Sequence, residues 1–346
     1  MNNDGGFDGR SSGGGAARAL ALAALLACPA LAMAQVDYNV YGVADLSWGR
    51  FETSGSIKDD HFNSNSMSAT FIGLNLKDAL DGGWLPGLTM ETFFRFQDFA
   101  TGRKPNDPLL SRNAFASLGS EYGSVRIGRL QTYLFDTTVR FNALGNSIAF
   151  SPAVRHVFQS GNLEGVQGDF YWDRALSYST PNLNGFTFNA MAAKGAAAHR
   201  GDYGGASAVW AYGLFAGALS VQRVHLNDGI NDPTIENTLQ AGATYDFGVA
   251  RLFGEATWTN DIGLGVRSHI FTMGAAIPLG PGTLDIQGAV TNATGLAVDR
   301  KHSTGSVAYL YNWDSQTDFY VAAMDDRVRG QTRGLSAAVG VRRKFD

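Results

Sequence analysis

Charged side chains on two kinds of segment could act together on an ion. Arg95 and Arg126 stand at the polar positions of stretches in which alternate residues are apolar, so each would project from the polar face of a strand. Asp136, Glu164 and Asp169 lie on the long connection that follows the second stretch. Cations on a wall facing carboxylates on a loop would create an electric field across a narrow aqueous space. Such a site steers ions and breaks no covalent bond.

Each of these charges also has a simpler interpretation. Any of them could be a charge at the rim of the protein or one half of a structural ion pair. Arg140 and Arg155 lie on the same connection and could offset its acidity. The hypothesis therefore depends on whether the strands place Arg95 and Arg126 on the wall of a water-filled lumen.

Catalytic and metal-binding patterns are missing from the sequence. The six histidines are scattered and none has HExxH or paired-ligand spacing: His61, His156, His199, His225, His269 and His302. In the adjacent pairs Ser268-His269 and His302-Ser303 the two side chains would point to opposite faces of a strand. No Gly-x-Ser-x-Gly motif is present. We therefore expect no catalytic residue, no metal site and no cofactor.

The segments that would carry the charges alternate with a period of two residues. In 36–48 the even positions are mostly apolar, and the odd positions include Asp37, Asp45 and Ser47. The same pattern recurs to the end of the chain. It predicts about sixteen strands, near 36–50, 66–77, 87–98, 112–119, 124–131, 170–180, 185–194, 206–213, 217–226, 236–246, 249–259, 267–277, 283–292, 303–313, 317–326 and 334–345.

The polarity of these strands favours a transmembrane antiparallel β-barrel. One set of alternate positions is apolar along nearly every strand. The alternative is an exported soluble β-sandwich or β-helix, which should expose many charged residues. Short connections such as 121–123 and 246–248 alternate with longer polar ones. The longer ones are 52–65, 101–108, 227–233 and 294–303. Short turns at one end and long loops at the other are typical of outer-membrane barrels.

Composition agrees with this fold class. The chain has 43 Gly, only 9 Pro and 12% aromatic residues, which suits many strands and tight turns. A net charge of −4 without any basic run argues against nucleic-acid binding. No segment reaches the roughly 18 apolar residues that a membrane helix needs. A mature chain that enters a membrane must therefore do so as a closed barrel.

The N-terminus has the features of a secretory signal. Arg10 and Arg18 precede the short apolar region 19–28, and Ala32-Met33-Ala34 is an A-x-A cleavage site. We predict a signal peptide at 1–34 and a single barrel domain at 35–346. Cys28 is the only cysteine, and cleavage would remove it. The alternative is that 25–28 is a poor lipoprotein box and that Cys28 is lipidated.

The last strand bears on barrel closure. Leu335, Ala337, Val339, Val341 and Phe345 form its apolar face. A strand at the end of the chain is either an exposed edge, which proteins avoid, or the strand that closes a barrel. One further residue, Asp346, follows the terminal aromatic residue.

Several segments resemble the general porins of β-proteobacteria, a Gram-negative family. They are FIGLNLKDALDGG (71–83), RNAFASLG (112–119), YGSVRIGR (122–129), RALSYSTPNLNGF (174–186), GATYDFG (242–248) and VGVRRKF (339–345). These segments occur in order along nearly the whole mature chain. Two departures stand out: 312–317 reads NWDSQT where the family usually has a Ser-Lys-Arg-Thr turn, and Asp346 follows Phe345.

The resemblance implies a sixteen-stranded, homotrimeric general diffusion porin in the Gram-negative outer membrane. Such a barrel lies among outer-membrane lipid and lipopolysaccharide and passes ions and small hydrophilic solutes. Its third extracellular loop, here about 132–169, folds into the channel, and Arg112 and Arg129 join the wall candidates. Val341 and Phe345 would be read by the barrel assembly machinery, so we expect Asp346 to slow insertion modestly. The alternative is a barrel that acts mainly as a surface adhesin or receptor.

Overall fold

The computed structural model describes residues 36–105, 107–159, 164–194, 201–226, 234–296 and 298–346. The predicted leader, with Cys28, lies outside the described residues. Residues Asp37–Asp346 form one compact unit. Among the described residues, no helix has both the length and the apolar character needed to cross a membrane.

Sixteen long strands build this unit, and each overlaps one of the sixteen predicted strands. They are β1 (Asp37–Phe51), β3 (Phe71–Lys77), β4 (Leu85–Arg95), β6 (Ala114–Ser120), β7 (Gly123–Gln131), β8 (Tyr171–Ser179), β9 (Phe186–Lys194), β10 (Asp202–Tyr212), β11 (Phe215–Leu226), β12 (Thr234–Asp246), β13 (Arg251–Asp261), β14 (Val266–Leu279), β15 (Gly282–Gly295), β16 (Asp299–Asn312), β17 (Thr317–Val328) and β18 (Gly334–Phe345). Two short strands, β2 (Asp59–Asn63) and β5 (Ala100–Thr101), lie in segments predicted as loops.

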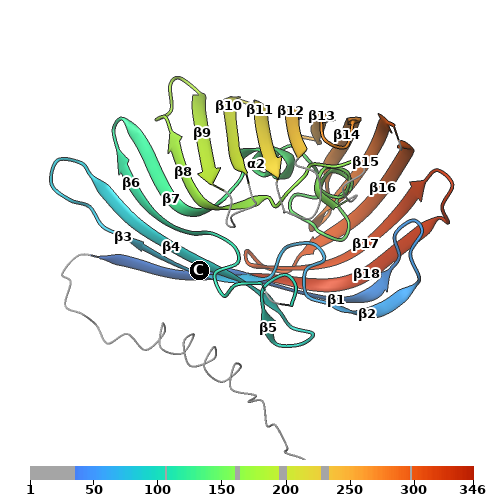
Figure 1. The fold of residues 1–346 in the computed structure, drawn as a ribbon. Coiled ribbons are helices and arrows are strands. Elements are labelled where there is room, and N and C mark those ends of the chain that lie inside the picture. Colours follow the sequence, from blue (N-terminus) through green and yellow to red (C-terminus); the bar gives the residue numbers. More distant parts are fainter. Residues whose placement is uncertain (1–35, 106, 160–163, 195–200, 227–233, 297) are drawn as a thin grey trace, which may run out of the picture. The chain divides into compact units, whose positions relative to one another are not determined.

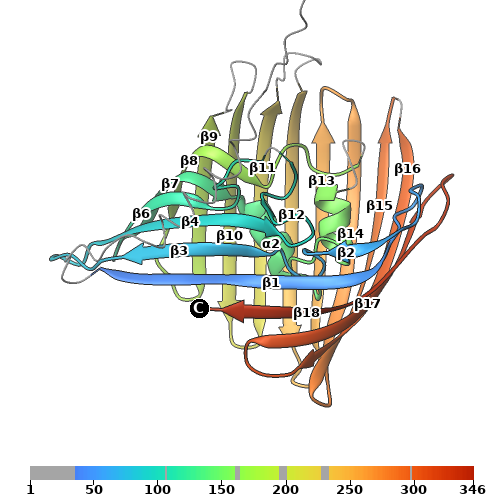
Figure 2. The same ribbon diagram turned by 90° about the horizontal axis from the view of Figure 1, so that it is seen from below.

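Pairing of the first and last long strands closes the sheet. Each long strand pairs antiparallel with its neighbour in sequence, and β18 also pairs with β1, with Gly42 opposite Phe345 and Leu46 opposite Val341. Figures 1 and 2 show β18 running beside β1. The prediction that the C-terminal strand closes a barrel is confirmed. Closure satisfies the backbone of both strands, which a lipid environment demands.

The two faces of the wall have opposite polarity. On β1, the outward-facing Trp48 is 54% exposed, whereas its inward-facing neighbours Asp45 and Ser47 are 0% and 2% exposed. Val339 on β18 is 56% exposed, and Ser336 is buried. An apolar outer face around a polar interior is the reverse of a soluble β-sandwich and matches a transmembrane barrel.

One predicted connection is wrong in length. The segment 294–303 was expected to be a long loop, but β15 continues to Gly295 and β16 begins at Asp299. Its polar residues belong to strand ends that extend the hydrogen-bonded ladder. The predicted loop 227–233 lies outside the described part of the chain.

The connection between β7 and β8 contains helices that the sequence did not predict. They are α2 (Tyr133–Arg140), α3 (Pro152–Val154) and the π-helix η1 (Arg155–Gln159). The Thr132 hydroxyl caps α2 by accepting from the Phe135 backbone N–H. At eight residues, α2 is shorter than the stretch of about 11–18 residues over which a helical period is recognised in a sequence.

Helix α2 packs on the inner face of strands β10, β11 and β12 (Figure 1). The Thr137 and Ser220 hydroxyl oxygens lie 2.6 Å apart, and the Gln240 amide donates to the Thr138 hydroxyl at 2.8 Å. Gly242 makes room for the connection, because a Cβ there would lie 2.6 Å from the Phe141 ring. The connection is therefore held against the inside of the barrel.

Barrel closure leaves no room for a side chain at Gly42, which can be tested by substitution. A Cβ at this position would lie 2.3 Å from the Phe71 carbonyl oxygen and 2.6 Å from the Phe345 ring. We expect Gly42→Val to destabilise the barrel by about 1–3 kcal/mol through overpacking, measured by urea titration of folding into lipid vesicles. Gly305→Val is the matched control, since nothing lies within 4 Å of a Cβ there. Equal midpoints for the two variants would contradict the role assigned to Gly42.

Candidate functional site

A cluster of arginines and carboxylates joins the barrel wall to the β7–β8 connection. Arg129 donates from Nη1 to Asp173 at 2.8 Å and from Nη2 to Asp169 at 3.4 Å. Arg103, on the β4–β6 connection, grips the same Asp169 carboxylate with two hydrogen bonds of 2.9 and 2.6 Å. Asp169 therefore ties together a wall strand and two connections. No sequence pattern predicts Arg103 as a site residue, because it lies in a polar loop without alternation.

The orientation of Arg129 depends on a β-bulge. Val125 and Ile127 face outward, so strict alternation along β7 would also turn Arg129 toward lipid. The register with β8 shifts between Gly128 and Leu130. Gly128 has φ of +143°, and a Cβ there would lie 2.2 Å from the Ala114 carbonyl oxygen. The bulge re-aims Arg129 toward its carboxylate partners.

Asp169 keeps its charge in this setting. Burial acts to raise the pKa of Asp169, but the hydrogen bonds and positive charge of Arg103, together with the charge of Arg129, outweigh it and hold the pKa below its usual range. The carboxylate is therefore ionised at neutral and mildly acidic pH.

Arg112 is neutralised by a carboxylate on the neighbouring strand. Its guanidinium donates to Glu91 and lies 3.8 Å from the centroid of the Phe71 ring. Glu91 also accepts from the Tyr41 hydroxyl at 2.5 Å and from the Asn113 amide at 2.8 Å. The Glu91 carboxylate therefore balances the positive charge of Arg112 on the wall.

Arg126 has no such carboxylate partner among the residues that the structure describes. It donates to the Tyr133 hydroxyl at 3.0 Å, and no described carboxylate oxygen lies within 4.0 Å of its guanidinium. Asp136, on the exposed side of α2, accepts a hydrogen bond from the Gln131 amide. The positive charges of Arg126, Arg140 and Arg112 act on Asp136. The structure therefore brings Arg112, Arg126, Arg129, Asp136 and Asp169 into one charged region.

Arg95 and Glu164 have separate partners. Arg95 donates to Asp98 at 2.7 Å and to the Gly102 carbonyl at 2.9 Å, so it fastens the turn after β4. Glu164 is buried against another part of the wall, where it accepts from His302 at 2.7 Å and lies 3.2 Å from Arg300. Arg95 therefore holds the turn after β4 in place, and Glu164 holds the β7–β8 connection, each through its own set of contacts.

The His302 contacts form a buried ionic latch between the β7–β8 connection and the wall. His302 on β16 has Nδ1 2.7 Å from Glu164 and Nε2 2.7 Å from Asp326 on β17. Because a carboxylate oxygen can only accept, both ring nitrogens must donate, and His302 is an imidazolium. Its positive charge lies between two negative ones. We call Glu164, His302 and Asp326 the latch.

A second histidine stacks on the latch. The rings of His156 and His302 lie 3.9 Å apart at an interplanar angle of 18°. His156 contacts the Thr291 hydroxyl at 2.6 Å and the Thr304 hydroxyl at 2.8 Å. Burial, followed by the nearby charge of His302, lowers the pKa of His156 well below its ordinary value. His156 is therefore neutral and can stack on the imidazolium.

This histidine pair is poorly shaped for a metal ion. Among the described residues, His156, His302 and Asp326 form the group whose donor atoms all lie within 4.8 Å of one another. However, ring nitrogens direct their lone pairs in the ring plane, and two nearly parallel stacked rings cannot both point at one ion. The two ring nitrogens of His302 are also committed to carboxylates. The geometry favours a latch over a metal site.

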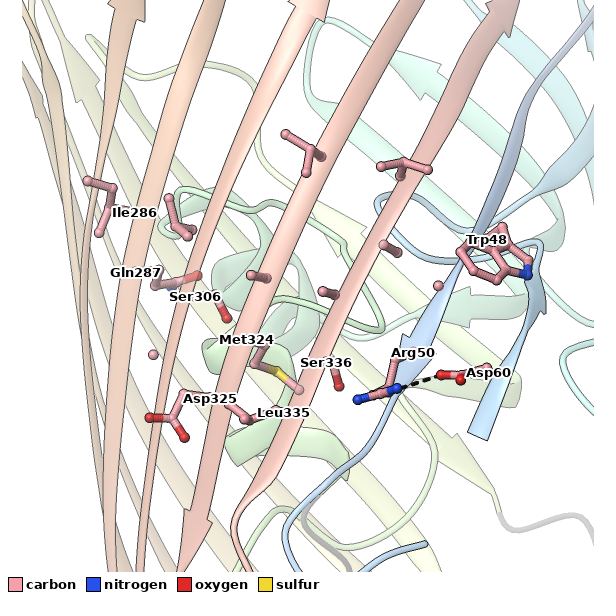
Figure 3. Close-up of a pocket in the computed structure, with 18 residues that line it drawn as sticks. Trp48, Arg50, Asp60, Ile286, Gln287, Ser306, Met324, Asp325, Leu335 and Ser336 are labelled. Carbon is pink, nitrogen blue, oxygen red and sulfur yellow. Dashed lines mark hydrogen bonds and ion pairs between the residues drawn. The ribbon is translucent and has the colours of Figure 1, made fainter. Parts of the chain in front are cut away.

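A cavity of about 570 Å³ lies beside the charged region. Arg103, Lys104, Arg112, Asp169 and Tyr171 are among its lining residues. A larger groove of about 890 Å³ crosses strands β15 to β18 and β1 (Figure 3). Exposed apolar residues such as Trp48 and Leu335 line that groove, so it belongs to the outer wall. The smaller cavity lies beside the charged region and is the one that concerns the candidate site.

A closed barrel with an apolar outer face, a polar interior and an internal charged connection defines the chain as an outer-membrane β-barrel channel. Comparison with known families identifies it further. The model of the Gram-negative porin family matches residues 21–331, and the chain belongs to this family. It is an outer-membrane diffusion porin of Gram-negative bacteria.

Individual relatives agree with this identification. Outer membrane porin protein 32 of Delftia acidovorans is 26% identical over 328 residues, which cover 88% of this chain and 87% of the relative. The anion-selective porin from Comamonas acidovorans has a similar structure, with a TM-score of 0.77, 21% identity, and coverage of 90% of this chain and 100% of that one. The trimer form of OmpT from Vibrio cholerae has a TM-score of 0.67, 12% identity, and coverage of 90% and 100%. These likenesses give no support to the adhesin alternative.

The latch yields a prediction about the β7–β8 connection. We expect His302→Gln to remove the central positive charge, leaving Arg300 beside Glu164 and the more distant Arg155 beside Asp326. Losing hydrogen bonds to charged groups should destabilise the latch by about 1.5–3 kcal/mol. Single-channel recordings should then show larger current fluctuations, because the connection moves more freely inside the barrel. His269→Gln is the control, since His269 is exposed on the outer face. Equal current noise in the two variants would refute the latch.

Proposed function

We propose that ions and small hydrophilic solutes diffuse passively through this barrel with a preference for anions, set by the charged region between the wall and the β7–β8 connection. The observation that carries the proposal is an excess of cations without carboxylate partners. Lys104, Arg126 and Arg140 each lack a described carboxylate within 4.0 Å, and Lys104 and Arg140 are exposed. Against them, Asp136 is the exposed carboxylate of α2.

Other carboxyl groups of the inner wall are covered by neighbouring side chains. Glu236, Glu255, Asp261 and Asp285 project inward but are buried. Because neighbouring groups cover them, a passing ion cannot contact these carboxyl groups directly as it can an exposed lysine or arginine. The structurally similar Comamonas protein is an anion-selective porin, which supports the same preference. In this proposal Arg112, Arg126, Arg129, Asp136 and Asp169 shape the field, while Arg95 and Glu164 hold the connections in position.

We also propose a homotrimer, for which the trimer form of the Vibrio OmpT structure gives support. Residues 1–34 would be removed on export, and Val341 and Phe345 would serve the barrel assembly machinery. Outer-membrane lipid and lipopolysaccharide would contact the apolar outer wall. The proposed function is passive transport and includes no catalytic step.

Bilayer recording tests the function itself. The mature chain, purified and inserted into a planar lipid bilayer, should conduct ions without any substrate or energy source. Because three pores would enter together, each insertion should close in three equal steps at high voltage. A folded barrel that never conducts would contradict the proposal and favour surface recognition.

Ion preference tests the role of Arg126. In a gradient of potassium chloride, Arg126→Gln should shift the reversal potential toward cations, because one unpaired positive charge is lost from the lumen. The permeability ratio should change by up to about fivefold, since a unit charge 4 Å away contributes about 1 kcal/mol in water. Arg223→Gln removes an exposed outward-facing charge and should leave the ratio unchanged. Identical reversal potentials for the wild type and Arg126→Gln would exclude Arg126 from the conduction path.

A further inference from the structure

The cavity of about 570 Å³ combines aromatic surface with positive charge. The rings of Phe135 and Phe170 stack with their centroids 4.3 Å apart at an angle of 15°. Phe158 meets both of them edge-on, at 5.2 and 5.6 Å. Phe158 and Phe170 are only partly buried, so part of their surface borders the cavity.

The aromatic surface is rigidly supported by Arg103. The Arg103 guanidinium lies 5.0 Å from the centroid of the Phe170 ring and 5.6 Å from that of Phe93. The same guanidinium is fixed by its two hydrogen bonds to Asp169. Ring and guanidinium therefore hold each other in place, which lowers the entropic cost of binding a solute against them.

The charges around the cavity select the sign of the solute. Three cations line it, Arg103, Lys104 and Arg112, whereas Asp169 is its lining carboxylate among the described residues. Arg103 and Arg129 bind Asp169, and Glu91 binds Arg112. Lys104 is exposed and has no described carboxylate partner, so it can bind an incoming anion. An organic cation would meet repulsion from these positive charges.

We propose that this cavity is a binding subsite for aromatic carboxylates, with the carboxylate at Lys104 and the ring against Phe158 and Phe170. The inference rests on the proposed function as a diffusion pore and adds a solute class to it. The cavity volume falls within the range of sites that hold small molecules. A small inorganic anion gains only the charge, and a neutral aromatic solute gains only the ring contact.

Current block tests the subsite. Chloride current through single reconstituted pores is measured while sodium benzoate, sodium acetate, sodium cyclohexanecarboxylate or benzyl alcohol is added. Benzoate should reduce the current at concentrations where the other three have little effect. The aromatic pair should favour benzoate over cyclohexanecarboxylate by about two- to tenfold. Equal block by these two anions would overturn the assignment of aromatic solutes.

Two variants assign the block to its residues. Phe170→Leu should raise the half-blocking concentration of benzoate by about two- to tenfold, and Lys104→Gln should weaken the block by benzoate without creating one by benzyl alcohol. Phe158→Leu provides a second ring variant if Phe170→Leu does not fold. The controls are Phe186→Leu and Lys301→Gln, which change exposed residues on the outer face.

The outcomes separate the subsite from the pore. Unchanged benzoate block in Phe170→Leu, Phe158→Leu and Lys104→Gln would overturn the subsite while leaving the diffusion pore intact. Absence of chloride current in the wild type would instead overturn the proposed function. Weakened block in the ring and lysine variants, with both controls unchanged, would support the subsite.

Discussion

The pairing of β1 with β18 is the constraint on which the rest of the structure depends. A chain in lipid cannot leave backbone N–H and C=O groups without partners, and a sheet avoids this only by closing on itself. Here the closing pair joins Gly42 to Phe345 and Leu46 to Val341. Once the ring is complete, alternate side chains are divided between lipid and lumen, and the polar positions acquire a shared interior.

Within that interior, side chains rather than backbone ladders hold the β7–β8 connection. Hydrogen bonds between Thr137 and Ser220 and from Gln240 to Thr138 hold α2 on β11 and β12. The latch holds Glu164 on β16 and β17, and Asp169 binds Arg103 and Arg129. The connection is thus attached at widely spaced points of the wall. Its charged and aromatic side chains keep fixed positions in a space that would otherwise be open.

The sequence predicted the wall well and the connection poorly. Alternation is a direct result of the lipid–water division, so all sixteen long strands left a visible pattern. Where a strand continues beyond the apolar band, as β16 does from Asp299, the pattern stops while the ladder continues, and the predicted boundary fell short. Helix α2 was missed because it spans only eight residues, fewer than the stretch over which a helical period can be distinguished from chance.

The same contrast between wall and connection applies to the prediction of the site residues. Alternation placed Arg126 on the inner face, but Arg129 reaches its partners only through a bulge at Gly128 that alternation does not reveal. Arg103 and the stacked pair of His156 and His302 depend on contacts between residues far apart in the chain. The spacing of residues along the sequence cannot predict such contacts, because they form only when the barrel closes.

The grip of Arg103 on Asp169 has a consequence for how such a pore is studied. At about 1 M salt the Debye length is only about 3 Å, against about 8 Å at physiological ionic strength. The two hydrogen bonds between Arg103 and Asp169, at 2.9 and 2.6 Å, are shorter than either length and partly buried, so added salt screens them far less than it screens the exposed charge of Lys104. Recordings in concentrated electrolyte should therefore preserve this attachment while weakening the attraction of Lys104 for an approaching anion.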